Sequence, residues 1–214
     1  MSVAAVVLAA GRGLRFGATK QFTLLGEETL AARSVRAARC VADVVIVVVP
    51  ADYEGGGEGA DLVVTGGATR AASVRAGLAR VGEASVVVVH DAARPLASEA
   101  LFHAVVDAVL AGADGAVPGV TPSDTIKRVL QRGDTTTVAA TLARDELVAV
   151  QTPQAFQTHV LVAAHAAQAD ASDDAALVEA NGGVVVVVPG EAANLKVTDP
   201  EDALRARVLV EGRW

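Results

Sequence analysis

Cysteine, long hydrophobic runs and basic segments are all scarce in this sequence. Cys40 is the single cysteine, so no disulfide can form within the chain, which fits a reducing compartment. Apolar runs such as Val44–Val49 and Val184–Val188 are far shorter than the roughly 20 residues that span a bilayer. No basic leader precedes the first apolar run. These absences predict a cytoplasmic protein that does not bind membranes.

Positive charge and aromatic residues are also limited. Lys and Arg number 18 against 25 Asp and Glu, which gives a formal net charge of −7. Because a protein that binds the nucleic-acid backbone normally carries a cationic surface, this balance disfavours nucleic acid as a partner. Aromatic residues make up 3 % of the chain, so Val, Ala and Leu must fill the core. Cys40 lies in an apolar helical stretch and is interpreted as a small core residue.

The hydrophobic pattern alternates between short β-branched runs and longer amphipathic stretches. Strands are predicted over Val3–Leu8, Val44–Val49, Leu62–Val64, Ser85–Val89, Gly115–Val120 and Val184–Val188. Helices are predicted over Thr29–Arg39, Arg70–Arg80, Ser98–Ala111, Thr158–Gln168, Asp173–Ala180 and Pro200–Val210, with Ser98 as an N-cap and Pro200 in a first turn. This alternation favours one α/β domain over residues 1–214, with a doubly wound, mostly parallel sheet.

The segment from Thr125 to Val150 breaks this rhythm. It contains short, exposed β-rich pieces at Ile126–Leu130, Thr135–Ala140 and Leu147–Val150. Gly133 and Asp134 supply a turn signal between the first two pieces. Because a ribbon of two or three strands is marginal alone in water, it needs a partner surface. Two interpretations follow: an extension of the main sheet, or an arm that grips a second subunit.

A glycine-rich loop from Ala9 to Lys20 follows the first predicted strand. Its small residues allow backbone N–H groups to approach a ligand closely, and Arg15 and Lys20 add cationic donors. Together they indicate a polyphosphate site, although a plain surface loop is the alternative. A P-loop is excluded because five residues separate Gly11 from Gly17 and no Gly-Lys pair occurs. A dinucleotide fingerprint fits poorly, since its third glycine would fall at Phe16.

Two further loops follow predicted strands, at Gly66–Val74 and His90–Pro95. Ligands bind beyond the carboxyl ends of parallel strands in open α/β sheets, so polar groups here are candidates for contacts. Asp91 has the chemistry to accept hydroxyl groups, and Arg94 to bind a phosphate. The alternatives are a helix start after a tight loop for the first segment, and capping groups or surface ion pairs for the second.

These motifs, in this order, resemble the 2-C-methyl-D-erythritol 4-phosphate cytidylyltransferase family of the nucleotidyltransferase superfamily. The resemblance rests on Ala9–Gln21, Gly66–Val74, His90–Pro95, Asp124–Lys127, Thr152–Phe156, Ser172–Ala175 and Asn194–Asp202. It implies a Rossmann-like nucleotidyltransferase fold with a β-arm at residues 125–150 that forms a homodimer. It also implies transfer of CMP from CTP to 2-C-methyl-D-erythritol 4-phosphate, with release of pyrophosphate, in the non-mevalonate route to isoprenoids.

The resemblance assigns a role to each site residue. It places Ala9, Ala10, Gly11, Gly13, Arg15, Lys20, Gly67, Ser73, Asp91, Ala92 and Lys196 at CTP. It places Asp91, Arg94, Thr125, Arg144, Thr152, Ser172 and Lys196 at the sugar-alcohol phosphate, with Thr125 and Arg144 reaching the site of the neighbouring subunit. Magnesium, or another divalent cation, is expected to bind mainly through the CTP phosphates, and among protein groups Asp91 is only a candidate.

The implied chemistry is electrostatic. The nucleophile is a phosphate that is already an oxyanion at neutral pH, since its second pKa is about 6, so no strong general base is needed. Arg15, Lys20, Arg144 and Lys196 are the predicted catalytic residues, and the histidines are interpreted as structural or surface groups. The alternatives are a ribitol-5-phosphate cytidylyltransferase, a sugar-1-phosphate nucleotidyltransferase that uses another base, and a non-catalytic nucleotide-binding protein.

Overall fold

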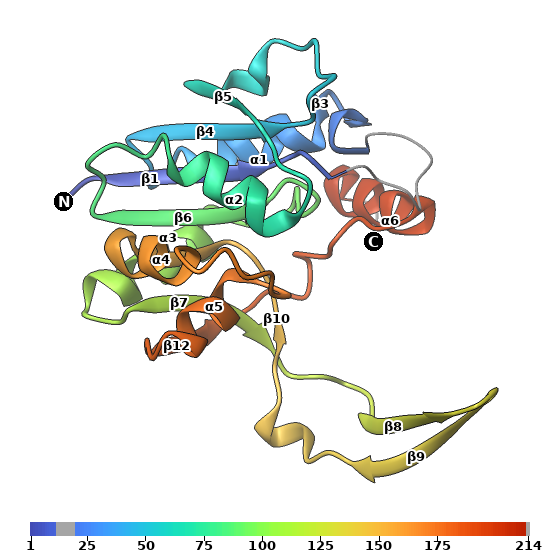
Figure 1. Cartoon of the computed structure of the whole chain (residues 1–214). Coiled ribbons are helices and arrows are strands. Elements are labelled where there is room, and N and C mark those ends of the chain that lie inside the picture. Colours follow the sequence, from blue (N-terminus) through green and yellow to red (C-terminus); the bar gives the residue numbers. More distant parts are fainter. Residues whose placement is uncertain (12–19, 213–214) are drawn as a thin grey trace.

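The computed structural model describes residues 1–11 and 20–212 and shows a central sheet with helices on both faces (Figure 1). The strands of this sheet are β1 (Val3–Leu8), β4 (Val44–Val49), β5 (Leu62–Thr65), β6 (Val86–Asp91), β7 (Gly115–Val120), β10 (Ala149–Val150), β11 (Gln154–Gln157) and β12 (Val185–Pro189). The helices are α1 (Leu30–Ala38), α2 (Arg70–Leu78), α3 (Glu99–Leu110), α4 (Thr158–His165), α5 (Asp174–Ala180) and α6 (Pro200–Glu211).

The sheet runs in the order β10-β7-β11-β6-β1-β4-β5, and β12 also pairs with β7. Parallel pairs join β1 with β4 and β6, β4 with β5, and β7 with β12. The carboxyl ends of β1, β4, β5 and β6 therefore meet at one edge, where a ligand site is expected. The predicted doubly wound α/β fold is confirmed.

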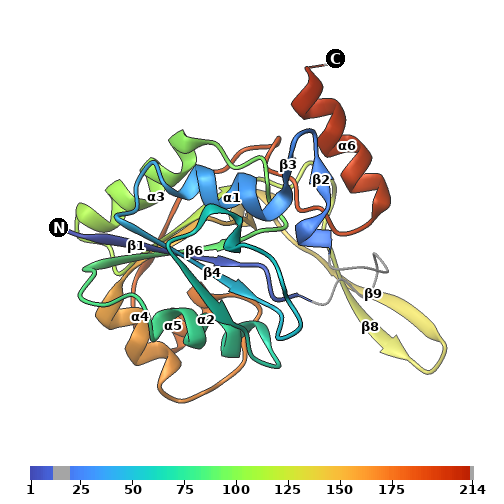
Figure 2. The ribbon, with the colours of Figure 1, turned by 90° about the horizontal axis from the view of Figure 1, so that it is seen from above.

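The core lies in two layers, one on each face of the sheet. Ala5 and Val7 of β1 pack in the layer under α1 and α3, whereas Ala4 and Val6 pack in the layer under α2, α4 and α5. Figure 2 shows these two groups of helices on opposite sides of the strands. Because both faces of β1 are buried, its sequence is a continuous apolar run and not an alternating one.

The predicted strands and helices outside the arm are confirmed, with ends that agree to within three residues. Ser98 caps α3, since its Oγ accepts the N–H of Leu101 at 3.1 Å. Pro200 opens α6, behind a capping box formed by Asp199 and Asp202. The sequence did not predict β11, which lies antiparallel between β6 and β7.

The arm is a two-stranded hairpin of β8 (Lys127–Arg132) and β9 (Thr135–Thr141), which projects away from the body (Figure 1). The predicted bounds of 125–150 need correction, because β10 pairs with β7 in the central sheet. Gly119 explains this pairing: a Cβ atom there would lie 2.9 Å from Cβ of Val148, so only glycine admits the strand so closely. The interpretation as an extension of the main sheet holds for β10, whereas contact of the hairpin with a second subunit stays a prediction.

Cys40 is partly buried and packs against the layer under α1 and α3. Burial raises the pKa of its thiol to about 11, which suits a packing role and not a nucleophile. Within residues 1–11 and 20–212, no helix combines the length and the apolar character that crossing a membrane requires.

Candidate active site

A cavity of about 510 Å³ opens at the carboxyl ends of β1 and β6. Its walls are formed by Leu8, Ala10, Gly11, Lys20, Gln21, Gly67, Ala68, Thr69, Arg70, Ser73, Asp91, Ala93, Lys196 and Thr198. Seven predicted site residues are among them: Ala10, Gly11, Lys20, Gly67, Ser73, Asp91 and Lys196. Residues separated by more than 180 positions in the chain thus share one cavity, where the fold class predicts a ligand.

The loop before α2 forms one wall. Gly67 N–H donates to Ser73 Oγ at 3.1 Å, and the Ser73 hydroxyl donates to the Thr69 carbonyl at 3.0 Å. A Cβ atom at Gly66 would lie 2.4 Å from Cβ of Ala10, so a side chain there would push this wall away from the end of β1. Ser73 therefore holds the loop in place, and Ser73 itself also lines the cavity.

The described ends of the glycine-rich loop, at Ala10, Gly11 and Lys20, also line the cavity. Lys20 begins a 3₁₀ turn at Lys20–Phe22, is 8 % exposed and lines the cavity. Gln21 Nε2 donates to the Gly11 carbonyl at 2.9 Å and joins the two ends of the loop. Gly13 and Arg15, two of the predicted CTP contacts, lie outside the described residues.

Ala9 and Ala92 are buried beneath the cavity surface. Both are 0 % exposed and neither is among its lining residues. The Ala9 N–H donates to the Val48 carbonyl at 2.7 Å, and the Ala92 N–H donates to the Leu8 carbonyl at 3.0 Å. They extend the sheet contacts by one residue beyond β1 and β6, and so fix where the two loops begin.

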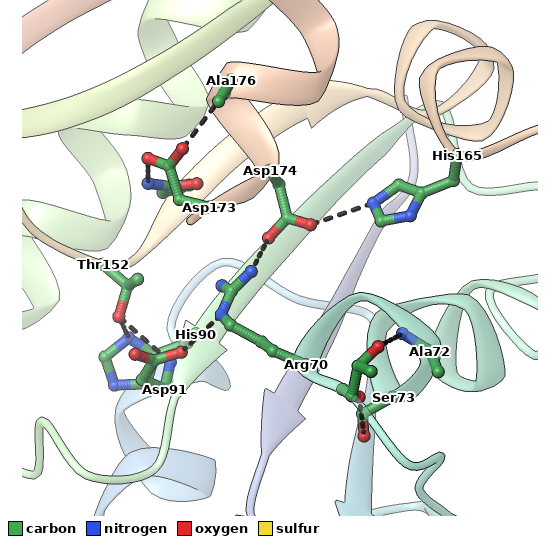
Figure 3. A network of polar contacts seen from close by, with 12 residues as sticks. Arg70, Ala72, Ser73, His90, Asp91, Thr152, His165, Asp173, Asp174 and Ala176 are labelled. Carbon is green, nitrogen blue, oxygen red and sulfur yellow. Dashed lines mark hydrogen bonds and ion pairs between the residues drawn. The ribbon is translucent and has the colours of Figure 1, made fainter. Parts of the chain in front are cut away.

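Asp91 pairs with two cations, and Figure 3 shows the contact with Arg70. Lys196 Nζ lies 2.7 Å from Asp91 Oδ2, and Arg70 Nε lies 3.4 Å from Asp91 Oδ1. Burial opposes ionisation of this carboxyl, but the charges of Arg70 and Lys196 outweigh it and hold its pKa below the usual range. Asp91 is therefore an anion in the absence of ligand, and its charge is compensated by two cations.

His90 and Thr152 form a buried support behind Asp91. Thr152 Oγ1 accepts the Asp91 N–H at 3.0 Å, so its own hydrogen is directed to His90 Nδ1 at 3.1 Å. His90 Nε2 then carries the ring proton and donates to the Arg94 carbonyl at 3.2 Å. Burial lowers the pKa of His90 to about 4, so the ring is neutral at pH 7. Thr152 thus acts through the backbone of Asp91.

Lys196 lies in a loop between β12 and α6, and its side chain is 45 % exposed. Its apolar neighbours in the sequence predict the end of a buried strand, but the structure places it in this loop. Its position is set instead by Asn194, which is fully buried and donates to Gln151 Oε1 at 3.1 Å and to the Thr152 carbonyl at 2.9 Å. Two residues later, the lysine faces Asp91.

Arg94 does not line the cavity. Its Nη1 donates to the Asn194 carbonyl at 2.7 Å, and its Nη2 lies 3.5 Å from the Val150 carbonyl. These contacts join the loop that carries Lys196 to the end of β10. The structure therefore gives Arg94 a supporting position, and its predicted phosphate contact stays a prediction.

Thr125, Arg144 and Ser172 also lie outside the cavity lining. All three are exposed, and Arg144 Nη1 donates to the Ser123 carbonyl at 2.9 Å, at the base of the arm. A single chain therefore brings together the predicted CTP contacts that the structure describes, with Ala9 and Ala92 beneath the surface. It leaves the arm residues apart.

Sequence reasoning gave no role in the active site to Arg70, Asp174 or His165. Arg70 Nη1 lies 2.7 Å from Asp174 Oδ2, and His165 Nε2 lies 2.9 Å from Asp174 Oδ1. In the sequence, Asp173 and Asp174 indicate favourable negative charge in the first turn of a helix. Asp174 lies in that turn of α5, and Asp173 caps the helix by accepting the N–H of Ala176 at 3.1 Å. The signal in the sequence was an arginine in the first turn of α2, where the helix dipole favours acidic residues.

The described residues offer no ready metal cage. Among residues 1–11 and 20–212 no group of three or more His, Cys, Asp or Glu side chains is placed to hold a metal ion. The Asp91 carboxylate is already paired with Arg70 and Lys196. These donors therefore fit a cation that arrives with a ligand better than one bound by the protein alone.

Comparison with known proteins gives a consistent result. The profile of the family described as "IspD: 2-C-methyl-D-erythritol 4-phosphate cytidylyltransferase" matches residues 3–212. A protein of that name from Saccharopolyspora erythraea is 43 % identical, and the match covers 98 % of this chain and 100 % of the relative. The crystal structure of the enzyme of that name from Thermus thermophilus superposes with a TM-score of 0.82 and 36 % identity, over 96 % of this chain and 98 % of that one.

Other relatives are longer. The bifunctional enzyme IspD/IspF of Clavibacter michiganensis is 46 % identical over 96 % of this chain but only 53 % of its own length. The chain thus spans about half the length of the first such relatives. The family profile nevertheless covers almost every described residue, including all those that line the cavity. The chain therefore belongs to the 2-C-methyl-D-erythritol 4-phosphate cytidylyltransferase family.

Proposed function

We propose that this chain transfers CMP from CTP to 2-C-methyl-D-erythritol 4-phosphate, giving 4-diphosphocytidyl-2-C-methyl-D-erythritol and pyrophosphate. An oxygen of the acceptor phosphate forms a bond to the α-phosphorus of CTP, and the bond from that phosphorus to the β-phosphate oxygen breaks. Family membership supports the reaction. The observation that carries it is the cavity itself, whose walls bring Lys20, Arg70 and Lys196 together with Asp91 at the carboxyl edge of the sheet.

The two walls of the cavity suit the two ends of a nucleotide. Ser73 and the backbone of Gly67 offer hydrogen bonds for the base, and Asp91 offers a carboxylate for ribose hydroxyl groups. Lys20 lies in the glycine-rich wall, where it would neutralise charge on the triphosphate during transfer. Arg15 is assigned the same role from the sequence. Magnesium bound to CTP would supply further charge neutralisation at the phosphates.

Lys196 is suited to hold the incoming phosphate. Its amine is half exposed, and its backbone is fixed by Asn194 and Gln151. Holding two anions in line contributes largely to catalysis when no covalent step on the protein is needed. The Lys196 amine pairs with Asp91 without ligand, so phosphate binding requires it to exchange one anion for another.

The arm supports a homodimer in which each chain completes the site of the other. Thr125 and Arg144 lie outside the cavity of their own chain. The hairpin beyond them exposes apolar side chains: Val129 is 51 % and Val138 is 63 % exposed. An isolated two-stranded hairpin with exposed apolar residues is marginal in water, and a second copy of the chain would cover it.

A pyrophosphate-release assay tests the proposed function. The protein is incubated with CTP, magnesium and, in separate reactions, 2-C-methyl-D-erythritol 4-phosphate, ribitol 5-phosphate and sugar 1-phosphates. We expect release only with the first acceptor, and at least about 100-fold slower release with UTP or ATP, because a site built for one pattern of hydrogen bonds leaves polar groups unpaired with another base. Activity with ribitol 5-phosphate alone would favour the alternative acceptor, and no release with any pair would contradict the proposal.

A further inference from the structure

Arg70 joins two carboxylates that belong to different elements of the fold. It is the first residue of α2, and its side chain lines the cavity. Its Nε lies 3.4 Å from Asp91 at the end of β6, while its Nη1 lies 2.7 Å from Asp174 on α5 (Figure 3). Because a guanidinium offers several N–H donors in one rigid plane, a single arginine can hold both contacts at once.

Asp174, the carboxylate that Arg70 contacts on α5, is itself held in place. The Asp174 side chain is 1 % exposed, and its second oxygen accepts from His165 Nε2 at 2.9 Å. Asp173, the preceding residue, caps α5 and also accepts from Gln154 Nε2 at 3.0 Å. Asp174 is therefore fixed in position, and it fixes the end of the Arg70 side chain.

The two cations at Asp91 differ in their freedom to leave it. Lys196 is 45 % exposed, carries a flexible side chain and contacts Asp91 through its amine. Arg70 is 26 % exposed and is held from behind by Asp174. Entry of a phosphate anion would thus draw Lys196 away, while Arg70 stays with Asp91.

We propose that Arg70 is a positioning residue that keeps Asp91 paired while Lys196 turns from Asp91 to the phosphate groups of the substrates. This inference rests on the proposed function. Without Arg70, movement of Lys196 would leave a largely buried carboxylate with no cation, which is strongly unfavourable. Asp91 would then hold Lys196 and compete with the substrates for it.

Replacement of Arg70 by glutamine tests this role through steady-state kinetics. For Arg70→Gln we expect kcat, measured at one fixed concentration of the acceptor, to fall about 30- to 100-fold and KM for CTP to change less than about threefold, because Lys196 must leave Asp91 to hold the incoming acceptor phosphate. Arg70→Lys restores a cation at Asp91 but not the planar guanidinium that contacts both carboxylates, so it should recover about one third of kcat. Arg80→Gln removes the same charge from an exposed position just beyond α2 and should stay within about twofold of the parent.

A double-mutant cycle separates this role from a purely structural one. In an Asp91→Asn background, the neutral amide no longer needs a cation, so the further change Arg70→Gln should cost less than about threefold in kcat. If Arg70 only braces α2 against α5, its loss should cost as much in that background as in the parent. Such additivity would overturn the proposal.

An independent readout is the titration of Asp91, followed by carbon NMR of its labelled carboxyl group in the ligand-free protein. The pKa should rise in Arg70→Gln and remain unchanged in Arg80→Gln. If Arg70→Gln does not fold, Arg70→Met and Arg70→Ala enter the same comparison. An unchanged Asp91 pKa in every folded variant without a guanidinium overturns the inference. If the parent protein transfers no CMP but the Asp91 pKa rises in Arg70→Gln, only the proposed function is contradicted.

Discussion

The cavity and the arm present their predicted site residues in opposite ways. Around the cavity, side chains are held by second contacts: Asn194 is fully buried, and Asp91 is paired on both oxygens. On the arm, Thr125 and Arg144 are exposed. A preorganised cavity and an exposed arm are what we expect of a site that one chain begins and another completes.

The burial of apolar side chains, and the stability it provides, also differ between the central sheet and the arm. Val45, Val47 and Val87 of the central sheet are 0 % exposed, and each such side chain stabilises the fold by about 1.5–3 kcal/mol. Val138 on β9 is 63 % exposed and contributes little of this within one chain. We therefore expect the hairpin to gain most of its stability from a partner surface, whereas the cavity does not depend on one.

The largest expected effect is on the cavity side. Lys20→Ala should lower kcat about 100- to 1000-fold, the range observed when one donor that stabilises charge in a transition state is lost. The protein should remain folded, because the change removes an amine from the cavity wall and adds no bulk. Arg205→Ala is the control: it breaks an exposed pair with Glu201 on α6 and should change kcat less than about twofold. A folded Lys20→Ala protein with near-parental kcat would contradict the assignment of the glycine-rich loop.

The second prediction tests whether the arm acts across the proposed dimer interface. Arg144→Ala alone should lower kcat about 30- to 100-fold, on the scale of one lost phosphate contact. When it is mixed with Lys20→Ala at equal concentration and the subunits exchange, half of the dimers become hybrids with one intact site. Activity should then recover to roughly one quarter of the parental value, by the statistics of a twofold dimer.

Subunit exchange must be shown directly, for example by native mass spectrometry of isotopically labelled chains. If Arg144 acts within its own chain, every hybrid site carries one defect and mixing restores nothing. That result would mean that the arm takes no part in the active site of the partner chain and that the hairpin only holds the two chains together. Recovery in a mixture of Arg144→Ala with Thr125→Ala is not expected, because both residues would act from the same arm.

The sequence predicted the body of the fold well because its strands are buried on both faces. Continuous apolar runs such as Val44–Val49 have few competing interpretations, and β4 has these same bounds. The strand β11 was missed because it has four residues and begins and ends with glutamine. Its strand character comes from its place between β6 and β7, which is a tertiary effect.

Site residues were predictable where a motif gives them a direct role. Lys20, Ser73 and Asp91 fall on the cavity wall. Arg70 and Asp174 lie more than 100 positions apart in the chain, and neither residue type marks a pair by itself. The surroundings of Lys196 were misjudged for a related reason: Leu195 and Val197 flank it like a strand, but the buried side chain of Asn194 holds the segment as a loop.

The smallest prediction concerns the response of the two regions to pH. The pKa of His90 is lowered by burial from 6.5 to about 4, so between these values the unfolded chain binds a proton that the native chain does not. The free energy of unfolding should therefore fall as the pH is lowered from 7 towards 4. By pH 4.5 the loss due to His90 should be about 2 kcal/mol.

Denaturant unfolding of the parent and of His90→Gln at several pH values and one fixed protein concentration measures this loss. The glutamine is neutral throughout, so its curve should lack the part of the slope due to His90. Asp91 adds little above pH 4.5, since its lowered pKa makes it lose stability only as the pH falls through and below its ordinary range. Arg144→Ala, on an arm that contains no histidine, should keep the parental slope. Parallel curves for the parent and His90→Gln would mean that His90 accepts a proton in the native state, and that the buried support behind Asp91 is more accessible to water than its 0 % exposure indicates.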